Sequence, residues 1–122
     1  MKTNSLENTV NLYFDAWNSK GTANITALLK QCITTNFEYV TSSGIFTGLD
    51  KMAEIIEQNN IDVPGRSFRL CSNIDGYRNT GRWEWEMIIP NDNNIIGLDI
   101  FELDGDGKIA KVTGFFPELI RI

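Results

Sequence analysis

The chain has 122 residues, of which 42% are hydrophobic and only three are proline, and this composition predicts one folded domain over residues 1–122. Its formal net charge is −5 and no run of lysine and arginine occurs, so binding to nucleic acid or to an anionic membrane surface is not expected. Histidine is absent, which excludes Ser-His-Asp and Cys-His nucleophilic sites and removes the commonest metal ligand.

The first half of the chain predicts three helices and one strand. A helix of about sixteen residues begins near Asn4, because apolar residues recur at helical spacing, and Gly21 fits as its C-cap. A shorter helix begins near Asn24, a strand covers residues 36–41, and a third helix runs from near Gly48 to about Asn59.

The second half predicts a meander of four strands after the break at residues 64–65. The strands cover about residues 67–74, 79–90, 95–104 and 108–116, with turns at 75–76, 90–94 and 104–107. Helices followed by such a meander predict an α+β fold, with the helices on one side of a strongly curved antiparallel sheet.

No apolar signal segment or membrane-spanning run is found, so a cytoplasmic location without membrane attachment is expected. A disulfide between Cys32 and Cys71 stays open, but a reducing compartment favours two buried free thiols.

The acidic run at residues 102–108 (ELDGDGK) resembles part of a calcium-binding loop. Thr113 stands where that loop needs a bidentate glutamate, and the flanking segments are strands rather than helices. We therefore assign the run to a turn and predict no metal site.

Asp99 lies in the middle of a predicted strand, where aspartate is disfavoured. Alternation puts it on one face with Gly97, Phe101 and Leu103. Burial would raise its pKa, so that it could donate or accept a proton, and Tyr13 could donate a hydrogen bond to an oxyanion beside it. The alternative is a structural role, in which the Asp99 carboxyl is hydrogen-bonded internally and Tyr13 only packs.

Trp83, Trp85 and Met87 form the bulky face of the strand over residues 79–90. A base-stacking surface is disfavoured, because no basic residues are interleaved with these rings. On the first strand Glu38 and Tyr39 compete for the inward position. We favour Tyr39, because it then shares the apolar face with Phe37.

Four short segments carry a family resemblance: YFDAWN at residues 13–18, GLD at 48–50, LDIF at 98–101 and GKI at 107–109. They resemble the nuclear transport factor 2-like superfamily, and most of all its SnoaL-like group. The resemblance implies a cone-shaped α+β fold with three helices, in which a strongly bent mixed or antiparallel sheet wraps the long N-terminal helix and leaves a cavity. It also implies a homodimer through the outer sheet face, which would include Glu84, Glu86 and Lys111.

The steroid isomerases of this superfamily have an oxyanion-binding tyrosine on the first helix and a protonated aspartate in the penultimate strand. Tyr13 and Asp99 stand at the matching positions. Those isomerases also need an aspartate base on the first strand, where this chain has Tyr39, with Glu38 one place away. Related polyketide cyclases use a pocket aspartate as base, a role that Asp99 could fill.

Two functional hypotheses follow. The first is cofactor-independent chemistry on a small, apolar, carbonyl-bearing molecule, with Asp99 as acid or base and Tyr13 as hydrogen-bond donor. The second is a non-catalytic ligand-binding or dimerisation module. The first predicts a cavity of at least a few hundred Å³ at Asp99; the second predicts a filled cavity, or Asp99 paired with Arg82 or Arg78. The other residues predicted to line the pocket are Trp17, Phe37, Tyr39, Trp83, Trp85, Met87, Phe101, Val112 and Phe116.

Overall fold

The computed structural model describes residues 3–116, which form three helices and seven strands. The helices are α1 (Thr3–Trp17), α2 (Thr22–Leu29) and α3 (Leu49–Asp62). The strands are β1 (Ile33–Thr41), β2 (Gly44–Thr47), β3 (Ser67–Leu70), β4 (Asp75–Tyr77), β5 (Thr80–Ile88), β6 (Ile95–Leu103) and β7 (Ile109–Phe115).

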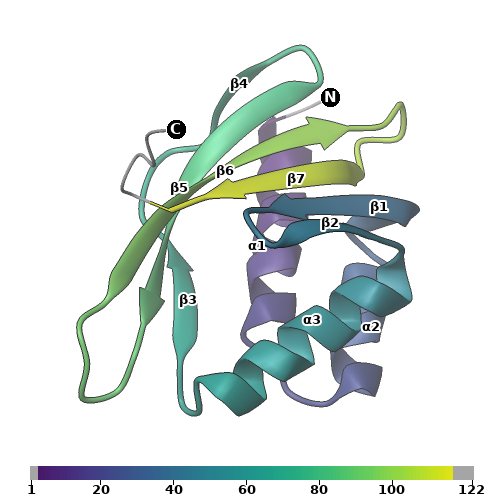
Figure 1. Cartoon of the computed structure of the whole chain (residues 1–122). Helices are drawn as coiled ribbons and strands as arrows, with labels where there is room; N and C mark the ends of the chain where they lie inside the picture. Colours follow the sequence, from purple (N-terminus) through teal and green to yellow (C-terminus); the bar gives the residue numbers. More distant parts are fainter. Residues whose placement is uncertain (1–2, 117–122) are drawn as a thin grey trace.

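The strands form one mixed sheet in the order β2-β1-β7-β6-β5-β3, and β4 pairs with the far end of β5. The pair β1–β7 is parallel and the other pairs are antiparallel. Figure 1 shows the sheet bending strongly, with the helices gathered on one side of it. The predicted α+β fold, with a bent sheet around the N-terminal helix, is therefore confirmed.

Register shifts accompany the bend. One lies between Glu102 and Leu103 in the β6–β7 pair, and another between Ile33 and Glu38 in the β1–β7 pair. Such irregularities bend a strand and increase its local twist. They lie on both sides of β7, so the sheet curves around the helices instead of lying flat against them.

The structure corrects three local predictions. Strand β2 was not predicted, and β4 occupies the residues expected to form a turn at 75–76. The tight turn lies instead at Arg78 and Asn79, where Arg78 has a φ of 56°. Gly21 precedes α2 with a φ of 86° and is not the C-cap of α1. Glycine adopts a positive φ both after the end of a helix and before the start of one. The presence of Gly21 therefore did not tell which of the two helices it caps.

The core lies between α1 and the concave face of the sheet. Val10, Tyr13 and Ala16 of α1 are buried at helical spacing. On β6 the residues Gly97, Asp99 and Phe101 are buried and alternate with more exposed neighbours, which confirms the predicted faces. Trp83 of β5 stacks on Phe101 at a centroid distance of 4.9 Å. This aromatic layer lies under the middle of the sheet.

The acidic turn is held by Asp104. Its Oδ1 accepts hydrogen bonds of 2.9 Å from the backbone N–H groups of Asp106 and Lys108, and Gly107 has a φ of 82°. The residues that resemble a calcium loop therefore satisfy the backbone of the β6–β7 turn, as the sequence analysis assigned them.

Cys32 and Cys71 are both free thiols, as favoured above, although Cys71 is only half-buried. Burial raises the pKa of the Cys32 thiol to about 12, so it stays protonated. Within residues 3–116 no helix is long and apolar enough to cross a membrane.

Candidate functional site

The Asp99 carboxyl is the polar centre of the concave face. It is 7% exposed and lies on β6 opposite Trp83 of β5. The Trp83 indole Nε1–H donates to Oδ2 at 3.1 Å, and the Trp85 indole Nε1–H donates to Oδ1 at 3.0 Å. Each carboxyl oxygen therefore has one neutral donor.

Neither arginine that was considered as a partner binds this carboxyl. Arg82 points to the other face of the sheet and pairs with Asp75 at 2.9 Å, and Arg78 is an exposed turn residue. Within the described residues, Asp99 forms no ion pair. The predicted pairing with Arg82 or Arg78, which was one mark of the structural alternative, is therefore wrong.

Two glycines make room for the carboxyl and its donors. Gly97 is the cross-strand partner of Trp85, and a Cβ on Gly97 would lie 2.1 Å from Cζ2 of that indole. Gly114 of β7 is the partner of Asp99, and a Cβ there would lie 3.2 Å from Oδ1. The Trp85 ring can therefore lie across β6 and reach Asp99 because position 97 has no side chain.

Burial raises the pKa of Asp99 from its ordinary value of 3.8 to about 7, and the hydrogen bonds from Trp85 and Trp83 oppose this shift. The ionised form loses its hydration inside the protein, and two neutral donors replace only part of it. A carboxyl in this state is divided between acid and base near neutral pH, which is the condition that proton transfer requires.

Two tyrosine hydroxyls from other elements lie near Asp99. The Tyr13 hydroxyl on α1 is fully buried and has no hydrogen-bond partner among the described residues. Burial raises the pKa of Tyr13, and repulsion from Tyr39 and Asp99 adds to the shift. The Trp17 side chain lowers this pKa slightly, but its contact falls short of hydrogen-bond geometry. A buried hydroxyl without a hydrogen-bond partner costs free energy of folding, so the Tyr13 O–H is available to donate a hydrogen bond to a bound molecule.

Tyr39, and not Glu38, faces the inside of the sheet. Its ring packs on Trp17 at a centroid distance of 6.0 Å, and its hydroxyl lies beside Gly114, close to the Asp99 carboxyl. Burial and the charge of Asp99 both raise the pKa of Tyr39. Glu38 pairs across the sheet with Thr47 and Lys111. The cavity wall therefore contains one carboxyl and two phenols.

The cavity at this site has a volume of about 110 Å³, so the predicted volume of a few hundred Å³ is wrong. Large rings take the space: Phe14, Phe68 and Trp85 all line it. An apolar cavity of about 150 Å³ holds benzene, so this one admits a molecule of only a few heavy atoms unless the molecule extends toward the half-exposed Phe116. The lining residues are Tyr13, Phe14, Trp17, Tyr39, Asn59, Phe68, Trp85, Met87, Asp99 and Phe116.

Seven of the residues predicted for the pocket are brought together here: Tyr13, Trp17, Tyr39, Trp85, Met87, Asp99 and Phe116. The other four, Phe37, Trp83, Phe101 and Val112, do not line the cavity, because they lie at 0–2% exposure in the core beneath it. That a side chain on a strand points inward does not tell whether it lies in the packed core or in the wall of the cavity. Trp83 still contributes through its hydrogen bond to Asp99.

Three of the lining residues were not predicted from the sequence. Phe14 follows Tyr13 on the apolar face of α1, and Phe68 alternates with exposed residues on β3, so both had a detectable pattern. Asn59 had none, because it lies on the last turns of α3 and reaches the cavity only through the packing of α3 against the sheet.

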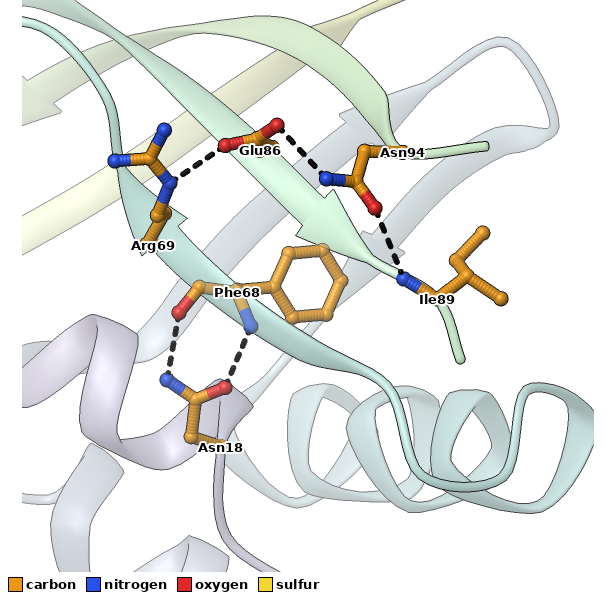
Figure 2. Close-up of polar contacts among 6 residues, drawn as sticks. All are labelled: Asn18, Phe68, Arg69, Glu86, Ile89 and Asn94. Atoms are coloured by element: carbon orange, nitrogen blue, oxygen red, sulfur yellow. Dashed lines mark hydrogen bonds and ion pairs between the residues drawn. The ribbon is translucent and has the colours of Figure 1, made fainter. Parts of the chain in front are cut away.

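Asn18 and Arg66 fix this part of the wall. The Asn18 side chain donates to the Phe68 carbonyl at 2.8 Å and accepts from the Phe68 N–H at 2.7 Å (Figure 2), which satisfies the free edge of β3. The buried Arg66 guanidinium donates to the Trp17 and Ile56 carbonyls and to Asn59 Oδ1, and lies over the Phe68 ring. These contacts tie α1, α3 and β3 together.

On the convex side of the sheet, Figure 2 shows a separate polar chain. Glu86 accepts from Arg69 and from Asn94, and the Asn94 side-chain oxygen accepts from the Ile89 N–H. The pKa of Glu86 is lowered mainly by its hydrogen bond from Arg69. This chain joins β3, β5 and the loop after β5, on the opposite face from Asp99.

The cavity therefore has chemistry for a neutral oxygen-bearing molecule. The Asp99 carboxyl can accept or donate a proton, and the Tyr13 hydroxyl has no hydrogen-bond partner within residues 3–116. The Tyr39 hydroxyl is a further donor in the same wall, and most of the other lining residues are aromatic. No group of three or more Cys, Asp or Glu residues within 3–116 is arranged to hold a metal ion.

Neither a scan of protein-family models nor a search of curated proteins finds a match for this sequence. Solved structures do match. A proposed isomerase of the SnoaL-like family from Agrobacterium tumefaciens is 27% identical, with a TM-score of 0.85 over 95% of this chain and 100% of that one.

Two further structures extend the likeness. A protein of unknown function with a cystatin-like fold from Methylobium petroleophilum has a TM-score of 0.82 at 19% identity, over 99% of this chain and 81% of its own. A proposed SnoaL-like polyketide cyclase from Jannaschia has a TM-score of 0.75 at 13% identity, over 93% and 86%. These two share the fold. Together with the bent sheet around α1 and the 27% identical Agrobacterium structure, the matches show that this chain belongs to the nuclear transport factor 2-like superfamily and is similar to its SnoaL-like proteins.

Proposed function

We propose that this protein binds a small carbonyl compound in the Asp99 cavity and catalyses proton transfer on it without a cofactor. The observation that carries the proposal is the Asp99 carboxyl, which lies in an aromatic cavity, has a pKa raised to about 7 and has no ion-pair partner among residues 3–116. The neighbouring SnoaL-like structures described as proposed isomerases or cyclases support the same class of reaction.

In the proposed step, ionised Asp99 takes a proton from the carbon next to the carbonyl. The electrons of that C–H bond form the carbon–carbon double bond of an enolate, and the negative charge moves to the carbonyl oxygen. Tyr13 donates its unpaired hydroxyl hydrogen bond to that oxygen. Return of the proton from Asp99 to a conjugated carbon gives isomerisation. If the Asp99 carboxyl first exchanges its proton with solvent, return of a solvent proton or deuteron to the original carbon gives exchange.

A single carboxyl performs both transfers in this scheme. That requirement follows from the first strand, where Tyr39 lines the cavity in place of a second acid. Tyr39 is a second candidate donor to the enolate oxygen.

Deuterium exchange tests the proposal. Acetone and butanone, which have only four and five heavy atoms and suit the small cavity, are incubated with protein in D2O, and loss of the α-proton signal is followed by NMR. General acid–base catalysis contributes about 10²–10⁴-fold, so Asp99→Asn should lower the exchange rate by about 100-fold or more. Tyr13→Phe should lower it less. The rate should rise with pH through about 7, as Asp99 ionises.

Glu84→Gln is the matched control, because Glu84 is an exposed carboxylate on the same strand pair but on the convex face. It should leave the exchange rate unchanged. Exchange that equals the buffer rate for every ketone, or that is identical in Asp99→Asn and the native protein, would refute the proposal.

A second candidate is a non-catalytic dimerisation module, and the convex face of the sheet favours it. Ile88, Ile96, Ile100 and Phe115 are 36–49% exposed there, near the Lys111–Glu102 ion pair at 3.9 Å. A face with apolar residues and both signs of charge suits a second copy of itself. We propose a homodimer through this face; sedimentation equilibrium should show a dimer that Ile100→Lys dissociates. A monomeric native protein would refute it.

A further inference from the structure

We infer that the Asp99 cavity also binds small organic ammonium ions, held by the carboxylate and by an aromatic belt that lines the cavity with it. The belt consists of Tyr39, Trp17, Phe68, Trp85 and Phe116. This inference goes beyond the proposed carbonyl chemistry and does not depend on it, because it requires the carboxylate and the rings but no proton transfer.

The belt is continuous. Successive ring centroids are 6.0 Å apart for Tyr39–Trp17, 5.0 Å for Trp17–Phe68, 5.8 Å for Phe68–Trp85 and 6.0 Å for Trp85–Phe116. Both ends of the belt are near Asp99. Trp85 donates its indole N–H to Oδ1, and a Cβ on Gly114 would lie 4.0 Å from the Tyr39 hydroxyl and 3.2 Å from the same Oδ1. Aromatic rings around a cavity attract cations through their faces, and quaternary ammonium groups are the usual ligands of such sites.

The charge balance of the cavity favours a cation. The groups that face Asp99 are the indoles of β5, Gly114 of β7, Tyr39 of β1 and Tyr13 of α1. The two tyrosines are neutral at physiological pH, because the pKa of each is raised. Ionised Asp99 therefore has no positive partner among the described residues, and an ammonium ion in the cavity would supply one.

Arg66 shows that two rings of the belt already accept a cationic group. Its guanidinium lies 4.9 Å from the Phe68 centroid and 6.0 Å from the Trp17 centroid, and it donates to Asn59 and to backbone carbonyls. It does not line the cavity. Its charge repels a second cation, so the belt alone is not sufficient and the bound ammonium ion depends on an ionised Asp99.

The size of the cavity selects the probe. A volume of about 110 Å³ is below the roughly 150 Å³ that holds benzene, and tetramethylammonium is slightly larger than benzene. The cavity would therefore take only part of this ion, and its remaining methyl groups would lie at the mouth against Phe116, which is 58% exposed. The neutral molecule tert-butanol has the same number of heavy atoms and nearly the same shape, so it serves as the uncharged control. All three tryptophans of the chain, Trp17, Trp83 and Trp85, lie in or beside the cavity.

The test is a titration of the native protein with tetramethylammonium chloride and with tert-butanol, at constant ionic strength set by KCl. Tryptophan fluorescence and the indole ¹H–¹⁵N signals report binding at pH 8.5 and pH 5.5. At pH 8.5 we expect tetramethylammonium to bind at least tenfold more tightly than tert-butanol. At pH 5.5, where Asp99 is protonated, we expect tetramethylammonium to bind at least tenfold more weakly than it does at pH 8.5. The indole signals of Trp83 and Trp85 should shift.

Three variants sharpen the result. Asp99→Asn should abolish the preference for the cation, and Phe116→Ala, at a rim position that is 58% exposed, should weaken binding about threefold through loss of one ring. Glu84→Gln on the convex face should change nothing. Equal affinity for the two probes, affinity for tetramethylammonium that is independent of pH, or a preference retained in Asp99→Asn would overturn the inference. Should Asp99→Asn not fold, the pH comparison in the native protein decides the matter.

The proposed ketone exchange and the inferred ammonium binding can be refuted independently of each other. Absence of α-proton exchange with intact, pH-dependent ammonium binding would remove the proposed function and leave this inference standing. Exchange without ammonium binding would do the reverse.

Discussion

The burial of Asp99 predicts that the protein loses stability as pH rises through neutrality. The folded state raises the pKa of this carboxyl from 3.8 to about 7, whereas the unfolded chain returns it to its ordinary value. The folded protein therefore binds more protons than the unfolded chain between about pH 4 and 7, and its free energy of unfolding falls as pH rises across that interval.

The magnitude follows from the size of the shift. A displacement of about three pKa units corresponds to about 4 kcal/mol, at about 1.4 kcal/mol per unit. The full stabilisation is present below about pH 4 and is lost by about pH 7, after which the Asp99 contribution is constant. Total stabilities of small domains are about 5–15 kcal/mol, so a change of this size is readily measured.

The assay is urea unfolding of the native protein and of Asp99→Asn, followed by circular dichroism at several pH values from 4 to 8.5. The asparagine side chain is uncharged throughout, so subtracting the two free energies cancels the other titrating groups. We expect the native-minus-variant difference to fall by about 4 kcal/mol between pH 4 and 8. A ¹³C titration of the Asp99 carboxyl should give a midpoint near 7.

A difference that stays flat or rises with pH would refute the reasoning, as would a carboxyl midpoint near 4. Either result would mean that water or an unidentified positive group reaches Asp99. The direct titration needs only the native protein, so the prediction remains testable even if the variant does not fold.

Two further predictions concern the positions that shape the cavity wall. Gly97→Ala places a Cβ 2.1 Å from the Trp85 ring, so we expect a loss of about 1–3 kcal/mol in urea unfolding and an upfield move of the Trp85 indole proton as its hydrogen bond breaks. Gly105→Ala, at a turn position with open space, is the control and should change the unfolding free energy little; equal effects of the two would contradict the argument. Asn18→Ala removes two hydrogen bonds to the edge strand β3, which should cost about 2 kcal/mol and speed amide exchange on β3. Asn11→Ala, at an exposed position on α1, should do neither, and unchanged exchange on β3 in Asn18→Ala would show that the edge is held by other contacts.

The sequence determined the three helices, the longer strands and the faces of those strands, although not the short strands β2 and β4. Position 99 lies between Gly97 and Phe101 on an alternating strand, so its carboxylate had to point to the same buried face as these two residues. The helical spacing of α1 likewise put Tyr13 on the buried side. These features depend on short-range periodicity, which a sequence carries directly, and the structure has them as predicted.

Only the tertiary structure decided what meets Asp99 and how much space remains. Periodicity gives the direction of a side chain but not the distance to the opposite wall, so Phe37 and Tyr39 looked alike, although one is core and the other lines the cavity. The small volume comes from rings on α1, β3 and β5, which the curved sheet brings together from distant parts of the chain. The two indole donors to Asp99 depend on the β5–β6 register and on the missing side chain at Gly97, because hydrogen bonding across strands is set by pairing and close packing rather than by local pattern.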